Sequence, residues 1–324
     1  MTAFSNKTNK EFIPYEVKGY LISAPLTANN AGNCMWGFAE KYGKRFFIKQ
    51  FLNPKFPDAN AEIYESTRIR MINQCEEWYK THEAVYEAII TCGGSNLVTP
   101  LDFFLEKNIY YLVTESINAS DIKFEEIYKH SSVHKDIILK VLAHEIACLA
   151  NKNVVHSDLK PDNIIVKSTV SDFFTVKIID FDASFLTSNL PEPDDITGDQ
   201  VYFSPEMLLY MAEEEGEITT KSDVFALGIL FHIILCGQIP QYNDEFDCLA
   251  EAVLNGDVPT LSADIPQFYK ALICDMLKVE VDERISAVDV LKRLFEKDSP
   301  PSKNQSTLSG PQVSKNGIYI NMKR

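Results

Sequence analysis

The sequence has no apolar run long enough to cross a bilayer, and its cysteines form no recognisable metal or disulfide pattern. The longest apolar run, Val224 to Cys236, has about 13 residues, whereas a membrane-spanning helix needs about 20. We therefore expect this run to form a buried helix and the chain not to insert stably into a membrane. The seven cysteines stand singly, without a C-x-x-C pair, which fits a reducing, cytoplasmic setting. The polar start MTAFSNKTNKEFIP does not resemble a secretion signal.

Basic side chains are also scarce. The 324 residues include 31 lysines and arginines against 46 aspartates and glutamates, a net charge of −15. Because such a surplus repels phosphate backbones and anionic lipids, nucleic acid is not an expected partner. The length and the 45% hydrophobic fraction predict a globular chain, with one domain of two lobes or two ordinary domains.

The stretch NVVHSDLKPDNIIV, residues 153 to 166, contains two short apolar runs around a polar loop. These runs predict two brief strands that hold a rigid turn. Asp158 and Asn163 stand five apart with Lys160 between them, so a carboxylate, a cation and an amide can converge. In phosphoryl transfer a carboxylate accepts the hydroxyl proton, an amide oxygen holds a metal, and a cation meets the moving phosphate. Protein kinases and small-molecule phosphotransferases both carry such a loop, so the loop alone leaves both classes open.

Downstream landmarks distinguish these two classes. The short strand in TVKIIDFDASF ends at Asp180, which resembles the aspartate of the kinase D-F-G motif. The segment that follows closes at Ser204-Pro205-Glu206, which resembles A-P-E. Asp223 opens the predicted buried helix, where kinases brace the catalytic loop, and Arg284 matches the arginine that pairs with the A-P-E glutamate. Small-molecule phosphotransferases lack the last three landmarks.

The chain thus resembles the eukaryotic-type protein kinase family over roughly residues 15 to 297, and Lys160 in DLKPDN is typical of its serine/threonine class. Phrases such as FIKQFL and YYLVTES are similar to bacterial members. The resemblance implies an α+β, bilobal protein-kinase-like fold. A small β-rich N-lobe would occupy residues 15–115 and a larger, mainly helical C-lobe residues 116–297. Residues 1–14 are expected to form a flexible arm, and the aperiodic residues 298–324 a disordered polar tail.

The family's activity is transfer of the γ-phosphoryl group of ATP, with Mg²⁺, to a hydroxyl of a protein substrate. The resemblance makes Asp158 the base and Lys160 the cation on the transferring phosphate. Asn163 and Asp180 would be the magnesium ligands.

Lys49 interrupts the apolar strand in KRFFIKQFL. One interpretation is a lysine on the solvent side of an alternating strand; the other is the kinase lysine that holds the α and β phosphates. Residues 75–90 have helical periodicity, and kinases use a helix here to bring a glutamate to that lysine. Glu83, about 80° from the middle of the apolar stripe, is the expected partner. The alternative is that every glutamate of this helix is solvated.

Other nucleotide contacts follow only from position. Gly32 and Gly37 are the only glycines of NNAGNCMWG, so the phosphate-covering glycine loop is degraded, with Gly32 as its expected remnant. The resemblance makes Thr114 the gatekeeper residue. It also makes Glu115 and Ile117 the hinge residues whose backbone meets adenine.

Three departures from the family pattern concern control and docking. Asp182 replaces the D-F-G glycine, and either restricts the backbone or adds a second carboxylate near the metal. Ser157 replaces an arginine that grips activation-loop phosphate, so phosphorylation there should matter less. Asp199 replaces a threonine that contacts the catalytic aspartate. The degraded glycine loop, Asp182 and Asp199 support an alternative function: a pseudokinase acting as a nucleotide-binding or scaffolding module.

Overall fold

The computed structural model of the chain describes residues 12–29, 32–169 and 174–297. The tail predicted at 298–324 and residues 1–11 of the predicted arm lie outside these ranges.

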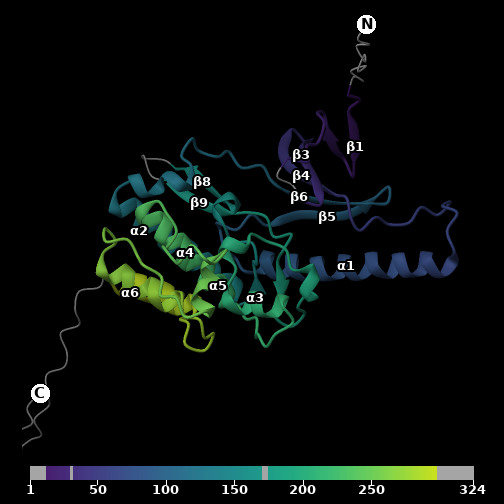
Figure 1. Ribbon diagram of the computed structural model, residues 1–324. Coiled ribbons are helices and arrows are strands. Elements are labelled where there is room, and N and C mark those ends of the chain that lie inside the picture. Colours follow the sequence, from purple (N-terminus) through teal and green to yellow (C-terminus); the bar gives the residue numbers. More distant parts are fainter. Residues whose placement is uncertain (1–11, 30–31, 170–173, 298–324) are drawn as a thin grey trace, which may run out of the picture.

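A six-stranded antiparallel sheet forms the N-terminal part of the molecule (Figure 1). Its strands lie in the order β1-β2-β3-β4-β6-β5. Their bounds are β1 (Tyr15–Val17), β2 (Tyr20–Ile22), β3 (Cys34–Lys41), β4 (Lys44–Phe51), β5 (Pro100–Glu106) and β6 (Ile109–Glu115). Lys49 lies on the central strand β4, between Trp36 of β3 and Leu112 of β6, and is buried. The interpretation of Lys49 as a solvent-side lysine is therefore wrong.

The long helix α1 (Glu65–Thr91) runs along this sheet, below β5 in the view of Figure 1. Most of the predicted helical stripe is confirmed, because Cys75, Val85, Tyr86 and Ile89 are buried, but its last member, Ile90, is exposed. The helix has 27 residues and begins well before the predicted stripe. Its extra turns account for the long stretch of sequence between Lys49 and that stripe.

The C-terminal part is mainly helical. Its helices are α2 (Ser132–Ala150), α3 (Pro205–Met211), α4 (Ser222–Cys236), α5 (Leu249–Leu254), α6 (Gln267–Met276) and α7 (Ala287–Glu296). Helix α4 is buried from Ser222 to Ile234, as its apolar sequence predicts, and packs against α2 and α6. It ends at Gly237, whose φ of +86° is a left-handed conformation that glycine adopts without strain. Within the described ranges, no helix combines the length and the apolar character that a bilayer crossing requires.

Two small antiparallel ladders sit where the two parts meet: β7 (Val154–Val155) with β10 (Phe185–Leu186), and β8 (Ile164–Ser168) with β9 (Phe174–Ile178). Four short 3-10 turns complete the described structure: η1 (Phe124–Lys129), η2 (Pro161–Asn163), η3 (Pro193–Asp195) and η4 (Gln200–Tyr202). The β-rich part and the helical part together form the bilobal α+β fold that the resemblance implied. The exact division between residues 115 and 116 stays a prediction.

Candidate active site

The loop between β7 and β8 is held from below by the first turn of α4. The Asp223 carboxylate is buried and accepts hydrogen bonds from the backbone N–H groups of His156 (2.7 Å) and Ser157 (3.1 Å). Ser157 has a φ of +70°, which is uncommon for a residue with a side chain and needs such support. The expectation that Asp223 braces this loop is confirmed.

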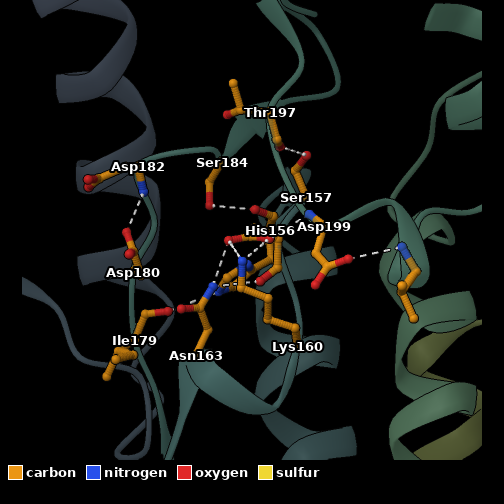
Figure 2. A network of polar contacts seen from close by, with 12 residues as sticks. His156, Ser157, Lys160, Asn163, Ile179, Asp180, Asp182, Ser184, Thr197 and Asp199 are labelled. Carbon is orange, nitrogen blue, oxygen red and sulfur yellow. Dashed lines mark hydrogen bonds and ion pairs between the residues drawn. The ribbon is translucent and has the colours of Figure 1, made fainter. Parts of the chain in front are cut away.

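Three groups converge on the carboxylate of Asp158, and Figure 2 labels the residues that supply them, Lys160, Asn163 and Asp199. Lys160 Nζ lies 2.9 Å from it, Asn163 Nδ2 donates to Oδ2 at 2.8 Å, and the N–H of Asp199 donates to Oδ1 at 3.0 Å. The carboxylate, cation and amide of the predicted loop therefore meet at one point. The Asp199 carboxylate instead accepts from Val201 N–H at 3.1 Å. Asp199 thus contacts Asp158 through its backbone, which no side-chain pattern would reveal.

Lys49 faces two carboxylates at the end of β9. Its Nζ lies 2.6 Å from Asp180 Oδ1 and 2.8 Å from Asp182 Oδ2. Burial alone would lower the pKa of Lys49, but the charges of Asp182 and Asp180 outweigh it and raise that pKa above its ordinary value. Burial would also raise the pKa of Asp180, yet the charge of Lys49 holds it below the usual range. For Asp182, burial dominates and raises the pKa to about 6, against the charge of Lys49.

The ion pair expected between Lys49 and Glu83 does not occur in the part of the chain that the structure describes. Glu83 is exposed on α1. Burial, and after it the nearby Glu83 carboxylate, raises the pKa of the Tyr79 phenol. The physical reason is the rotation of α1, because burial of Val85, Tyr86 and Ile89 turns Glu83 outward. The carboxylate that Lys49 was expected to receive from the helix comes from Asp182.

The remaining predicted nucleotide contacts lie at the end of β6, just after it, and just before β3. Thr114, near the end of β6, pairs with Phe47 of β4. Glu115 forms an ion pair with Lys177 of β9, so the predicted hinge is linked to the strand that leads to Asp180. Ile117 follows in the partly buried segment after β6. Gly32, in the turn before β3, has a φ of +52° and open space where a Cβ would be. Their contacts with nucleotide stay predictions.

The segment after Asp180 is anchored by a buried ion pair. Both guanidinium ends of Arg284 meet Glu206, at 2.7 and 2.8 Å. Burial alone would raise the pKa of Glu206, but the hydrogen bonds and charge of Arg284 hold it below its usual range. The predicted Glu206–Arg284 pair is confirmed, although only the family resemblance could have located two partners 78 residues apart.

A cleft of about 250 Å³ opens beside Lys160. Glu125, Asp162 and Asp199 line it together with Tyr202, so its lining is rich in carboxylates. Burial, followed by the charges of Asp199, Asp162 and Glu125, raises the pKa of the Tyr202 phenol. The cleft is therefore a place of negative potential next to Asp158.

The donor set also fits a hard divalent cation. Asp180 offers carboxylate oxygens and Asn163 an amide oxygen, and Mg²⁺ prefers oxygen ligands of this kind. Asn163 gives its side-chain nitrogen to Asp158, so the amide oxygen faces away from that carboxylate.

Comparison with known proteins gives a consistent picture. Residues 67–295 match a family model described as the protein kinase domain. The chain is 30% identical over 208 residues to "Calcium-dependent protein kinase 4" of Plasmodium berghei, covering 61% of this chain and 37% of that protein. It is 26% identical over 300 residues to "Calcium-dependent protein kinase 27" of Arabidopsis thaliana, covering 88% and 56%. A third relative is "Probable serine/threonine-protein kinase fhkC" of Dictyostelium discoideum, 27% identical over 247 residues, covering 69% and 41%. The chain thus spans about half or less of the length of these relatives.

Proposed function

The chain belongs to the protein kinase family, and from this premise we propose that it is an ATP- and Mg²⁺-dependent protein serine/threonine kinase. The observation that carries the proposal is the convergence of Lys160, Asn163 and the Asp199 N–H on the Asp158 carboxylate. A positioned carboxylate beside a cation is what transfer of a phosphoryl group to a hydroxyl requires.

Each residue has a distinct task in this proposal. Asp158 would accept the proton of the attacking serine or threonine hydroxyl, and its hydrogen bonds to Asn163 and Asp199 fix the direction of its oxygens. Lys160 would neutralise charge on the transferring phosphoryl group. Lys49 would hold the α and β phosphates, while Asn163 and Asp180 would hold magnesium. When bound, magnesium neutralises charge between the β and γ phosphates.

The cleft beside Lys160 suggests the class of substrate. Because carboxylates of Glu125, Asp162 and Asp199 line it, a protein segment with basic side chains near the phosphorylated hydroxyl would find complementary charge. We therefore propose basic protein substrates for the first assays.

A pseudokinase acting as a nucleotide-binding or scaffolding module is the second candidate. Its support is the degraded glycine loop around Gly32 and the replacement of glycine by Asp182. Against it, Lys49, Asp158 and Asp180 all keep the residue types that turnover needs, and a scaffold has no physical need for them together.

The test is incubation of the purified chain with γ-labelled ATP and magnesium, alone and with a generic basic protein. Asp158→Asn keeps the shape of the side chain and removes the base, so labelling should fall by at least about a hundredfold if the base contributes its usual factor. Asp194→Asn, at an exposed position in the same segment, is the matched control and should label like the unaltered chain. Equal labelling with and without Asp158, or none at all, would exclude the catalytic proposal.

A further inference from the structure

Lys49 receives its second carboxylate from an unusual place. Its Nζ lies 2.8 Å from Asp182 Oδ2, and Asp182 stands only two residues after Asp180 on the same loop. The Lys49 side chain is 9% exposed and that of Asp182 26%, so this ion pair is shielded from solvent. A charge-assisted contact at this distance in a shielded place fixes the direction of the lysine side chain.

Helix α1 brings no carboxylate to the same place. All of its glutamates are exposed, namely Glu65, Glu76, Glu77, Glu83 and Glu87. The buried face of the helix near the loop carries Tyr86 and the partly buried His82 instead. In this orientation α1 offers Lys49 no charged partner.

One buried polar atom on α1 and one on the loop after β9 are unpaired in the described part of the chain. Among the described residues, neither the Tyr86 hydroxyl nor Asp182 Oδ1 has a hydrogen-bond partner. Burial and then the charge of Asp182 raise the pKa of the Tyr86 phenol, so the two groups share one electrostatic environment. Figure 2 shows the Asp182 side chain directed away from the Asn163 cluster and toward this helix. Buried donors and acceptors are normally paired, so these two atoms are departures from the usual pattern at this place.

We propose that Asp182 is the positioning residue for Lys49, in the role that a glutamate of the helix was expected to fill. The proposal rests on the proposed function only in assigning ATP phosphates to Lys49. Asp182 was open to two interpretations, a restriction of the backbone or a second carboxylate near the metal. The proposal favours the second carboxylate and assigns it to Lys49.

The number of donors on Lys49 fits this role. An ammonium group has three N–H donors, and Asp180 and Asp182 accept two of them. The third remains for a phosphate oxygen. When Asp180 serves as a metal ligand, Asp182 still holds Lys49 in place, so the loop performs both tasks without an acid from α1.

The decisive comparison is Asp182→Asn against Glu83→Gln, with Glu87→Gln as the matched control on the same helix. Initial rates over a range of ATP concentrations separate kcat from KM, and calorimetry with a non-hydrolysable ATP analogue measures binding directly. We expect Asp182→Asn to lower kcat/KM for ATP by roughly 10- to 100-fold, the usual effect of losing one charge-assisted contact. The loss from Glu83→Gln should be at least about tenfold smaller.

Further variants separate positioning from folding. Because burial of the Asp182 charge, together with repulsion from Asp180, outweighs its attraction to Lys49, Asp182→Asn should keep or raise the melting temperature while activity falls. Asp182→Glu should restore part of the rate, since it returns the charge. Asp182→Gly places the ordinary family residue in the loop and should lose as much as Asp182→Asn.

The proposal is overturned if Glu83→Gln is as damaging as Asp182→Asn, or if Asp182→Gly keeps full activity. Failure of the proposed function looks different, because the unaltered chain and Asp158→Asn would then label equally. In that case binding of the ATP analogue still decides the matter. Weaker binding in Asp182→Asn than in Glu83→Gln supports the positioning role, and equal binding overturns it.

Discussion

Arg284 offers the largest single stability effect that can be worked out from the structure. Its side chain is fully buried, and all five of its N–H donors are used. Two of them meet the Glu206 carboxylate at 2.7 and 2.8 Å. The others meet the carbonyl oxygens of Lys278, Val279 and Lys221. Arg284→Met keeps much of the apolar stem and removes every one of these contacts.

The magnitude follows from what is left behind. Glu206 would stay buried, with the Ser222 hydroxyl, 2.7 Å away, as its remaining side-chain partner. Breaking a buried ion pair from one side costs about 3–5 kcal/mol. Domains are stable by about 5–15 kcal/mol, so the loss is a large share of the total. With about 2–4 °C per kcal/mol for a chain of this size, the melting temperature should fall by roughly 6–20 °C.

Thermal and urea unfolding measure this loss, with two comparison variants. Lys292→Met removes a surface pair with Glu296, 3.9 Å apart and exposed on both sides, and should change stability by less than about 1 kcal/mol. The double variant Glu206→Leu with Arg284→Met should be more stable than Arg284→Met alone, because no unpaired charge remains. The reasoning is refuted if Arg284→Met resembles Lys292→Met, or if the double variant is the least stable of the set.

Three further outcomes are expected. Phosphatase treatment should leave activity within about tenfold, because the Ser157 hydroxyl donates to the Thr197 carbonyl, at 3.5 Å, and has no charge to bind a phosphate. A larger loss in the measured rate would show control by loop phosphate. Asp223→Leu should lower kcat by roughly 10- to 100-fold, because the N–H groups of His156 and Ser157 lose their acceptor; turnover within twofold would contradict this. The pKa of Glu206 is lower in the folded chain than in the unfolded chain, so its contribution to stability is present above the unfolded pKa and is lost as pH falls through the folded pKa. The stability of Glu206→Gln should therefore depend less on pH than that of the unaltered chain between about pH 5 and pH 2, as acid unfolding would measure.

The sequence could predict the parts of the site that lie close together in the chain. Asp158, Lys160 and Asn163 lie within six positions of one another. A short turn between two strands brings side chains that are so close in sequence together in space. Lys49 was identifiable because a charged residue interrupts an apolar strand. The Glu206–Arg284 pair needed the family resemblance, since no local pattern links residues 78 apart.

The acid that meets Lys49 could not be predicted in the same way. It depends on the rotation of α1, which is set by how Val85, Tyr86 and Ile89 pack, and a helical residue placed 100° further round lies on another face. It also depends on the direction of the Asp182 side chain, which the sequence left open between two interpretations. Such choices are made by tertiary packing and leave no periodic signal.

Ser157 and Asp182 change the control of the site in the same direction. An arginine in the place of Ser157 would make the loop depend on a phosphate, yet here Asp223 supports the loop without one. A glutamate on α1 would make Lys49 depend on the position of that helix, yet here the loop that carries Asp180 supplies the acid. Ser157 removes a contact that must be switched on, and Asp182 replaces another such contact by one that the fold already holds. We therefore expect the purified chain to be active as synthesised. The contrary result would be a lag before labelling begins that disappears once the chain is phosphorylated and returns after phosphatase treatment.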